Sequence, residues 1–229
     1  MKRVALLALL MAGLSACAGG SPAAHPSPLG YHGVEPQSPP ARPSFTLTDL
    51  DGKRYDFQAE TKGRPTYLYF GYTHCPDECP TAMADVAAAL RKSPAKDRDK
   101  AVVVFVTTDP KRDTPAVMRQ FLDQFSKDFV GLIGTDQEVA AAETAAGVNV
   151  AEPGPPIPTI SGNPDAHPTE PGAPITHKHV GPLGYSVTHS AVILAYDADD
   201  RLPVLYPGGV TVADIANDLP LLIDPARAH

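Results

Sequence analysis

Two apolar runs limit what this chain can fold into. Residues 65–70 are β-branched and aromatic, and residues 101–107 (AVVVFVT) are apolar at almost every position. A strand without a polar face must be covered on both sides, as strands are in a sheet that lies between helices. Helical periodicity follows each run, over 81–92 and over 114–125. The chain therefore predicts an α/β fold with helices around a central sheet.

The remaining sequence pattern predicts that this sheet contains both parallel and antiparallel strands. Alternating residues on either side of a turn at 49–52 predict an N-terminal β-hairpin. Further strands are expected at 129–133, 190–197 and 201–206, and further helices at 136–146 and 212–223. Residues 151–183 are too rich in proline for a core element, so they predict an inserted, exposed loop.

Composition limits the class of protein. A chain of 229 residues with 43% hydrophobic and 20% charged residues is typical of one globular domain with short additions. The net charge of −7 argues against a nucleic-acid partner, because binding to phosphates requires clustered lysine and arginine.

The N-terminus indicates export and a membrane anchor. Two basic residues precede an apolar run at 4–14, which is too short to span a bilayer and is typical of a secretory signal. Residues 14–17 (LSAC) resemble the lipobox of bacterial lipoproteins. We therefore predict a lipoprotein signal peptide at 1–16, a lipidated Cys17 opening a proline-rich tether at 17–43, and a folded domain at 44–224. The expected location is extracytoplasmic, anchored to the bacterial cell membrane; the alternative is a plain secretory signal with an incidental cysteine.

Two further cysteines, Cys75 and Cys79, carry the expected chemistry. A disulfide that closes so short a loop adds little stability, so redox or metal chemistry is the better interpretation. The pair lies where a strand gives way to a helix, and a helix N-terminus stabilises thiolates. We therefore expect both sulfurs to be charged near neutral pH. Together with an imidazole they would suit copper, above all Cu(I).

These residues belong to a pattern that resembles the Sco/SenC copper chaperones. The resemblance rests on residues 70–80 (FGYTHCPDECP), 108–115 (TDPKRDTP) and 187–191 (VTHSA), and it covers roughly 44–224. It implies a thioredoxin-like fold and one bound copper, as Cu(I) or Cu(II), delivered to the copper-binding subunit of cytochrome c oxidase. Another copper chaperone or a thiol reductant is a further partner that the resemblance allows.

The resemblance also implies the copper ligands. Cys75 and Cys79 match the two thiolate ligands of the family, and His189 matches its histidine. In a thioredoxin-like sheet the strand that begins near Ser190 lies beside the strand that ends near Gly71, which would bring His189 to the cysteines. The chain departs from the family at Thr188, where members often have Asp, and in a longer proline-rich stretch.

Other polar side chains near these motifs receive plainer interpretations. His74 belongs to the motif without being a ligand. Asp77 and Glu78 complement the helix N-terminus, since Cu(I) disfavours carboxylates. Three histidines are expected in a solvated loop, with weak copper capture by the last two as the alternative: His167, His177 and His179. Three charged residues are expected to cap a helix and brace a loop, with partner docking as the alternative: Asp109, Arg112 and Asp113.

Two alternative activities use the same sulfurs. A thiol-disulfide oxidoreductase would cycle Cys75 and Cys79 between dithiol and disulfide, and would reduce the cysteines of the oxidase copper site. Whether the protein is an enzyme is therefore left open. A peroxidase of related fold would need a lone reactive cysteine in a threonine-rich pocket, which the CxxxC spacing fits poorly.

Overall fold

The computed structural model describes residues 29–156 and 185–228. The strands are β1 (Thr46–Asp49), β2 (Arg54–Asp56), β3 (Thr66–Gly71), β4 (Val102–Thr107), β5 (Val130–Ile133), β6 (Glu152–Pro156), β7 (Tyr185–Thr188), β8 (Val192–Tyr196) and β9 (Val204–Pro207). The helices are α1 (Phe57–Thr61), α2 (Glu78–Lys92), α3 (Ala95–Arg98), α4 (Pro115–Leu122), α5 (Asp136–Ala146) and α6 (Val212–Ile223), followed by a 3₁₀ turn at Pro225–Arg227.

Seven strands form one mixed sheet in the order β2-β1-β5-β4-β3-β8-β9. The central strands β3, β4 and β5 are parallel, and the other neighbouring strands are antiparallel. Every residue of β3 and β4 is buried, as their continuous apolar sequences predict. The predicted central mixed sheet and its N-terminal hairpin are confirmed.

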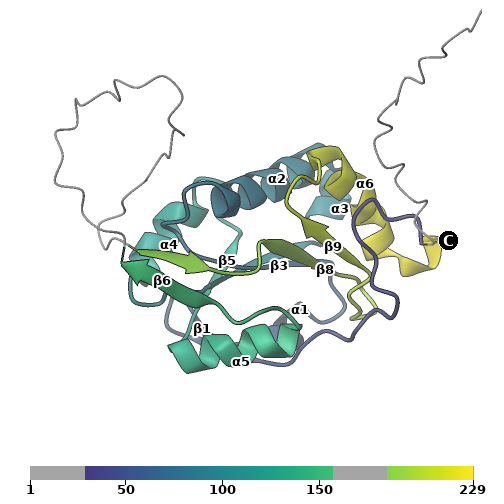
Figure 1. Cartoon of the computed structure of the whole chain (residues 1–229). Coiled ribbons are helices and arrows are strands. Elements are labelled where there is room, and N and C mark those ends of the chain that lie inside the picture. Colours follow the sequence, from purple (N-terminus) through teal and green to yellow (C-terminus); the bar gives the residue numbers. More distant parts are fainter. Residues whose placement is uncertain (1–28, 157–184, 229) are drawn as a thin grey trace, which may run out of the picture.

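Helices cover both faces of this sheet (Figure 1). On one face α2, α4 and α6 pack in an apolar cluster that includes Met83, Met118 and Leu219. On the other face α1 and α5 pack in a second cluster around Phe57 and Val139. The two clusters explain why the central strands need no polar side.

The pairing of β3 with β8 positions the functional residues. Thr66 lies opposite Tyr196 and Leu68 opposite Leu194, so the two strands run antiparallel. The residues just before β8 therefore lie near the end of β3. This confirms the predicted neighbourhood of the strand that begins near Ser190 and the strand that ends near Gly71.

Helix α2 begins at Glu78, three residues before the predicted start. The carboxylate of Asp77 accepts a hydrogen bond from the Glu78 N–H at 2.7 Å and caps the helix. The earlier start places Cys79 in the first turn. A similar cap begins α1 at Phe57, because the Asp56 carboxylate accepts a hydrogen bond from the Ala59 N–H at 3.1 Å.

The segment at 29–43 differs from the prediction. It was expected to be tether, but Val34 pairs with Leu205 and Ala41 pairs with Arg201. Arg42 is only 2% exposed, and its guanidinium donates to the Arg64 and Asp197 carbonyls. The folded region therefore begins near residue 29 and not at 44. The predicted signal peptide, Cys17 and the first part of the tether lie outside the described residues.

The proline-rich insertion also differs from the prediction where it is described. Glu152–Pro156 forms β6, which pairs with β7 in a separate two-stranded sheet. Proline is tolerated there because a two-stranded ladder leaves outward N–H positions unused. The rest of the predicted loop, with His167, His177 and His179, lies outside the described residues.

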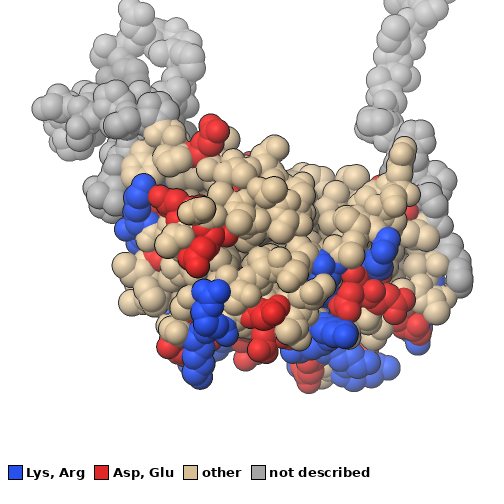
Figure 2. Space-filling model, turned by 90° about the horizontal axis from the view of Figure 1, so that it is seen from below, with Lys and Arg blue, Asp and Glu red and all other residues tan. Residues whose placement is uncertain are grey.

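Charges of both signs are interspersed on the face seen from below (Figure 2). Helix α5 contributes two ion pairs, Glu138 with Arg54 at 3.6 Å and Asp136 with Lys111 at 3.3 Å. Across residues 29–156 and 185–228, every helix is too short or too polar to cross a bilayer.

Candidate metal centre

Three side chains from distant parts of the chain converge beside the end of β3. The ligand atoms of Cys75, Cys79 and His189 all lie within 4.8 Å of one another. The Cys79 Sγ is 3.4 Å from the His189 Nε2, and the Cys79 N–H donates to the Cys75 Sγ at 3.4 Å. In the described part of the chain, this is the one group of three or more histidine, cysteine or acidic residues arranged to hold a metal.

Three separate elements supply these side chains. Cys75 lies in the loop between β3 and α2, Cys79 in the first turn of α2, and His189 between β7 and β8. Strands β3 and β8 are paired and antiparallel. The loop that follows β3 and the loop that precedes β8 therefore lie at the same end of the sheet. The sheet order thus closes a gap of 110 residues in sequence.

Aromatic rings surround the imidazole. His189 meets Tyr69 edge-on at 6.0 Å and Tyr72 edge-on at 5.6 Å between ring centroids. The Tyr69 hydroxyl also contacts the Cys79 Sγ at 3.9 Å. These contacts hold the imidazole against the sulfurs and limit the access of water. Neither tyrosine is identifiable from the sequence as a neighbour of His189, because neither strand alternation nor the loop motif says which ring will face the histidine.

The two thiols differ in burial and in proton affinity. Cys75 is partly exposed and Cys79 is fully buried. The hydrogen bond from Cys79 is the main cause that lowers the Cys75 pKa to about 4, with a further contribution from His189. Burial, followed by the nearby Cys75, raises the pKa of Cys79 well above its usual value. The expectation that both sulfurs are charged is therefore wrong for the metal-free pair, since a buried site does not hold two adjacent thiolates.

The pKa of the His189 imidazole depends on the neighbouring Cys75 thiolate. Burial lowers the pKa of His189, but the Cys75 thiolate and its hydrogen bond raise it by more, so the net direction is upward. The Cys75 thiolate thus favours the protonated form of the imidazole.

Asp113 fixes the loop that carries Cys75. Its buried carboxylate accepts from the Thr73 N–H at 3.0 Å, from the Thr73 hydroxyl at 2.6 Å and from the Thr107 hydroxyl at 2.7 Å. His74 Nδ1 lies 3.1 Å from the same Thr73 hydroxyl. His74 is therefore engaged beside the loop and is absent from the cluster of ligand atoms, in line with its interpretation.

Arg112 fixes the strand that leads to His189. It forms a buried ion pair with Asp109 and donates to the Tyr185 carbonyl at 2.9 Å. Its guanidinium lies 3.8 Å from the Tyr185 ring centroid and 5.6 Å from that of Tyr72, and the Tyr185 hydroxyl donates to Asp109 at 2.7 Å. These contacts support the bracing interpretation of the 109–113 segment. Tyr185 was missed, because nothing local links it to a segment more than seventy residues earlier.

Comparison with known proteins places these residues in one family. The SCO1/SenC family model matches residues 34–162, more than half of the chain. The chain belongs to the SCO1/SenC family. The matched region begins within the segment that packs on the domain and ends before His189, so the position of that histidine is known from the structure.

Solved structures show the same fold. The chain is 33% identical to ScoI of Bradyrhizobium japonicum, whose structure has copper bound, with a TM-score of 0.59 over 79% of this chain and 98% of that one. It is 26% identical to apo Sco1 of Thermus thermophilus, with a TM-score of 0.64 over 84% of this chain and 96% of that one. The predicted thioredoxin-like fold is confirmed.

Curated relatives match over a shorter region. The SCO2-like protein of Rickettsia felis is 39% identical over 98 residues, which are 42% of this chain and 45% of that protein. The matches span between 28% and 52% of the length of these curated relatives.

Proposed function

We propose that this protein is a copper metallochaperone of the cell exterior. It would bind one copper ion through Cys75, Cys79 and His189 and deliver it to the copper-binding subunit of cytochrome c oxidase. The convergence of two sulfurs and one imidazole nitrogen within 4.8 Å is the observation that carries this proposal. The likeness to a ScoI structure with copper bound supports the choice of metal.

The donor set fits the cargo. Metal bonds to cysteine sulfur and histidine nitrogen are about 2.0–2.3 Å long, so two ligands of one ion are up to about 4.6 Å apart. The ligand atoms here lie within 4.8 Å of one another, close to this limit before any metal enters. Two thiolates and an imidazole form a site of soft donors with a low coordination number. Cu(I) prefers such a site, whereas harder ions prefer carboxylates.

The difference between the two cysteines gives the transfer a direction. Cys75 is partly exposed and Cys79 is buried, so an incoming thiol or imidazole of a partner reaches the Cys75 side first. Cys79 and His189 would keep the ion until the partner supplies replacement ligands. Loading releases the proton of Cys79, because a thiol must lose its proton to bind the metal.

The proposed location rests on the sequence of the first residues. A lipidated Cys17 would hold the domain at the outer surface of the cell membrane, where the subunits of an oxidase are exposed.

Copper titration tests the metal site directly. Reduced protein titrated with Cu(I) under anaerobic conditions, in competition with a chelator, is expected to bind one ion per chain. Protein with the Cys75–Cys79 pair oxidised to a disulfide should bind none, because a disulfide has no thiolate to donate. Equal uptake by the reduced and the oxidised protein would contradict the proposal.

A second candidate function is thiol-disulfide exchange. The low pKa and partial exposure of Cys75, beside a buried Cys79 thiol, favour it, because this is the arrangement of an attacking and a resolving cysteine. The Cys75 thiolate would attack a partner disulfide and displace one partner thiolate. Cys79 would then lose its proton and attack the Cys75 Sγ, which leaves the partner reduced and this pair oxidised.

One substitution separates the two functions. His189→Ala removes a copper ligand but leaves both sulfurs, so it should weaken copper binding and largely preserve exchange with a disulfide substrate. An oxidoreductase without a copper role would show unchanged copper affinity in this variant.

A further inference from the structure

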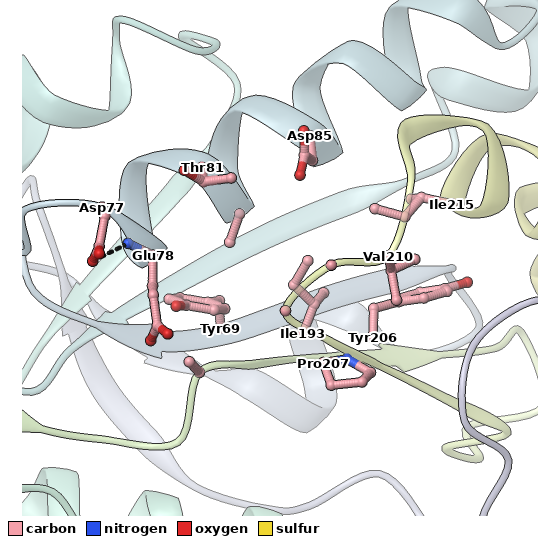
Figure 3. Close-up of a pocket in the computed structure, with 14 residues that line it drawn as sticks. Tyr69, Asp77, Glu78, Thr81, Asp85, Ile193, Tyr206, Pro207, Val210 and Ile215 are labelled. Carbon is pink, nitrogen blue, oxygen red and sulfur yellow. Dashed lines mark hydrogen bonds between the residues drawn. The ribbon is translucent and has the colours of Figure 1, made fainter. Parts of the chain in front are cut away.

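A pocket of about 430 Å³ opens beside the cysteine and histidine cluster. It lies between the first turns of α2, the start of β8 and the connection from β9 to α6 (Figure 3). Its volume is in the range of pockets that bind ligands or side chains. The pocket and the cluster share a wall, because Tyr69 lines the pocket and its hydroxyl contacts the Cys79 Sγ.

One side of the pocket is apolar. The residues of this side are Tyr69, Ile193, Tyr206, Pro207, Val210 and Ile215. The hydroxyl groups of the two tyrosines are already engaged, that of Tyr206 by Asp218 at 2.8 Å and that of Tyr69 by Cys79. The lining therefore presents carbon surface to an occupant.

Helix α2 adds carboxylates to the lining. Asp77, Glu78 and Asp85 line the pocket from α2, and Glu78 and Asp85 are seven positions apart, which puts them on one face of the helix. Figure 3 shows Glu78 reaching from α2 towards Tyr69. In the described part of the chain, none of these three carboxylates has a lysine or arginine partner, whereas Asp99, Asp123 and Asp136 each have one.

Asp85 is the least exposed of the three carboxylates. Its partial burial raises the pKa of its carboxyl group, so a cation beside it would favour the charged form. The mouth of the pocket offers little obstruction, because a side chain added at Gly208 would meet nothing within 4 Å. A partner chain can therefore approach the backbone closely at this rim.

We infer that the pocket receives a lysine or arginine side chain of a partner polypeptide that docks over the cysteine and histidine cluster. The aliphatic stem of such a side chain would lie on the apolar residues, and its charged end would meet Asp85. A neighbouring apolar residue of the partner would cover the rim at Pro207 and Gly208. That this partner is the copper acceptor rests on the proposed function; the preference for a basic side chain does not.

Peptide titration of the metal-free, reduced protein tests the pocket. The probes are the blocked tripeptides acetyl-Leu-Lys-Leu-amide, its arginine counterpart and its glutamate counterpart, with n-butylammonium as a free amine. Binding is followed by the shifts of backbone amide resonances. The two basic peptides should shift the amides of Glu78, Asp85 and Val210 and should bind more weakly as salt is added, while the glutamate peptide should not bind.

Charge variants supply the controls. Asp85→Asn should weaken binding of the lysine peptide by about two- to fivefold, as expected for a half-exposed ion pair, and Asp85→Lys should abolish it. Asp51→Asn, in the hairpin turn at the opposite edge of the sheet, changes the net charge equally and should leave binding unchanged.

The inference would be overturned by equal binding of the basic and acidic peptides, by equal effects of Asp85→Asn and Asp51→Asn, or by the absence of shifts around the pocket. Binding of n-butylammonium as tight as that of the peptides would assign the pocket to a free amine in place of a polypeptide. Since no copper is present, these results are independent of whether the cluster binds copper.

Discussion

The Sγ of Cys79 and the Nε2 of His189 lie 3.4 Å apart across 110 residues of sequence. Each of the two residues has its own support in the fold. Cys79 is fixed in the first turn of α2, and His189 is fixed by the pairing of β8 with β3 and by the rings of Tyr69 and Tyr72. The site is therefore largely assembled before a metal arrives, which reduces the ordering that copper binding must impose.

His189→Ala should weaken Cu(I) binding by more than about tenfold. A loss of about tenfold is the smallest that is typical of residues that only hydrogen-bond to a metal ligand, and His189 is a proposed ligand itself. His74→Ala is the matched control, because His74 adjoins Cys75 but is absent from the cluster of ligand atoms. Chelator competition measures both variants. Equal losses in the two variants would remove His189 from the ligand set.

The alkylation rate of metal-free Cys75 should stay high down to mildly acidic pH. Its pKa of about 4 means that the reactive thiolate persists at pH 5–7, whereas an ordinary cysteine is half ionised only near about pH 8.5. Rates with iodoacetamide between pH 4 and 9 measure this. Cys79→Ala removes the main cause of the shift and should move the midpoint upward. An unshifted midpoint in the unaltered protein would show that the hydrogen bond from Cys79 does not stabilise the thiolate.

Arg112→Ala should destabilise the fold by about 3–5 kcal/mol, because it leaves the buried carboxylate of Asp109 without its cation. Tyr185→Phe removes one hydrogen bond and should cost about 0.5–1.5 kcal/mol. Denaturant unfolding of metal-free protein measures both. A cost below about 1 kcal/mol for Arg112→Ala would mean that this ion pair does not brace the strand before His189.

Asp113→Ala should cost about 1–3 kcal/mol for each buried donor left without an acceptor, and Cu(I) affinity should fall with the loss of order in the Cys75 loop. The control is Asp123→Ala, which removes an exposed carboxylate just after α4 that pairs with Arg119 and should cost about 0.5 kcal/mol or less. Comparable costs for the two variants would contradict the bracing role of Asp113.

Cys17→Ser should release the protein from the membrane fraction into the soluble extracytoplasmic fraction, because it removes the proposed site of lipidation. Ser21→Ala, in the same segment, should leave the protein with the membrane. Fractionation followed by immunodetection distinguishes the variants. A Cys17→Ser protein that stays with the membrane would require another form of attachment.

The sequence determines much of this protein through local interactions. The unbroken apolar runs of β3 and β4 require cover on both faces, and the helix that starts beside Cys75 brings Cys79 within one turn of it. Packing determines the remainder. No local signal shows that residues 29–43 dock on the domain, because Arg42 finds its acceptors on residues far along the chain. The unequal thiols follow likewise from burial, which favours a proton on Cys79 but not on Cys75. The approach of His189 to the sulfurs depends on the pairing of β8 with β3, and strand pairing is a property of the whole sheet.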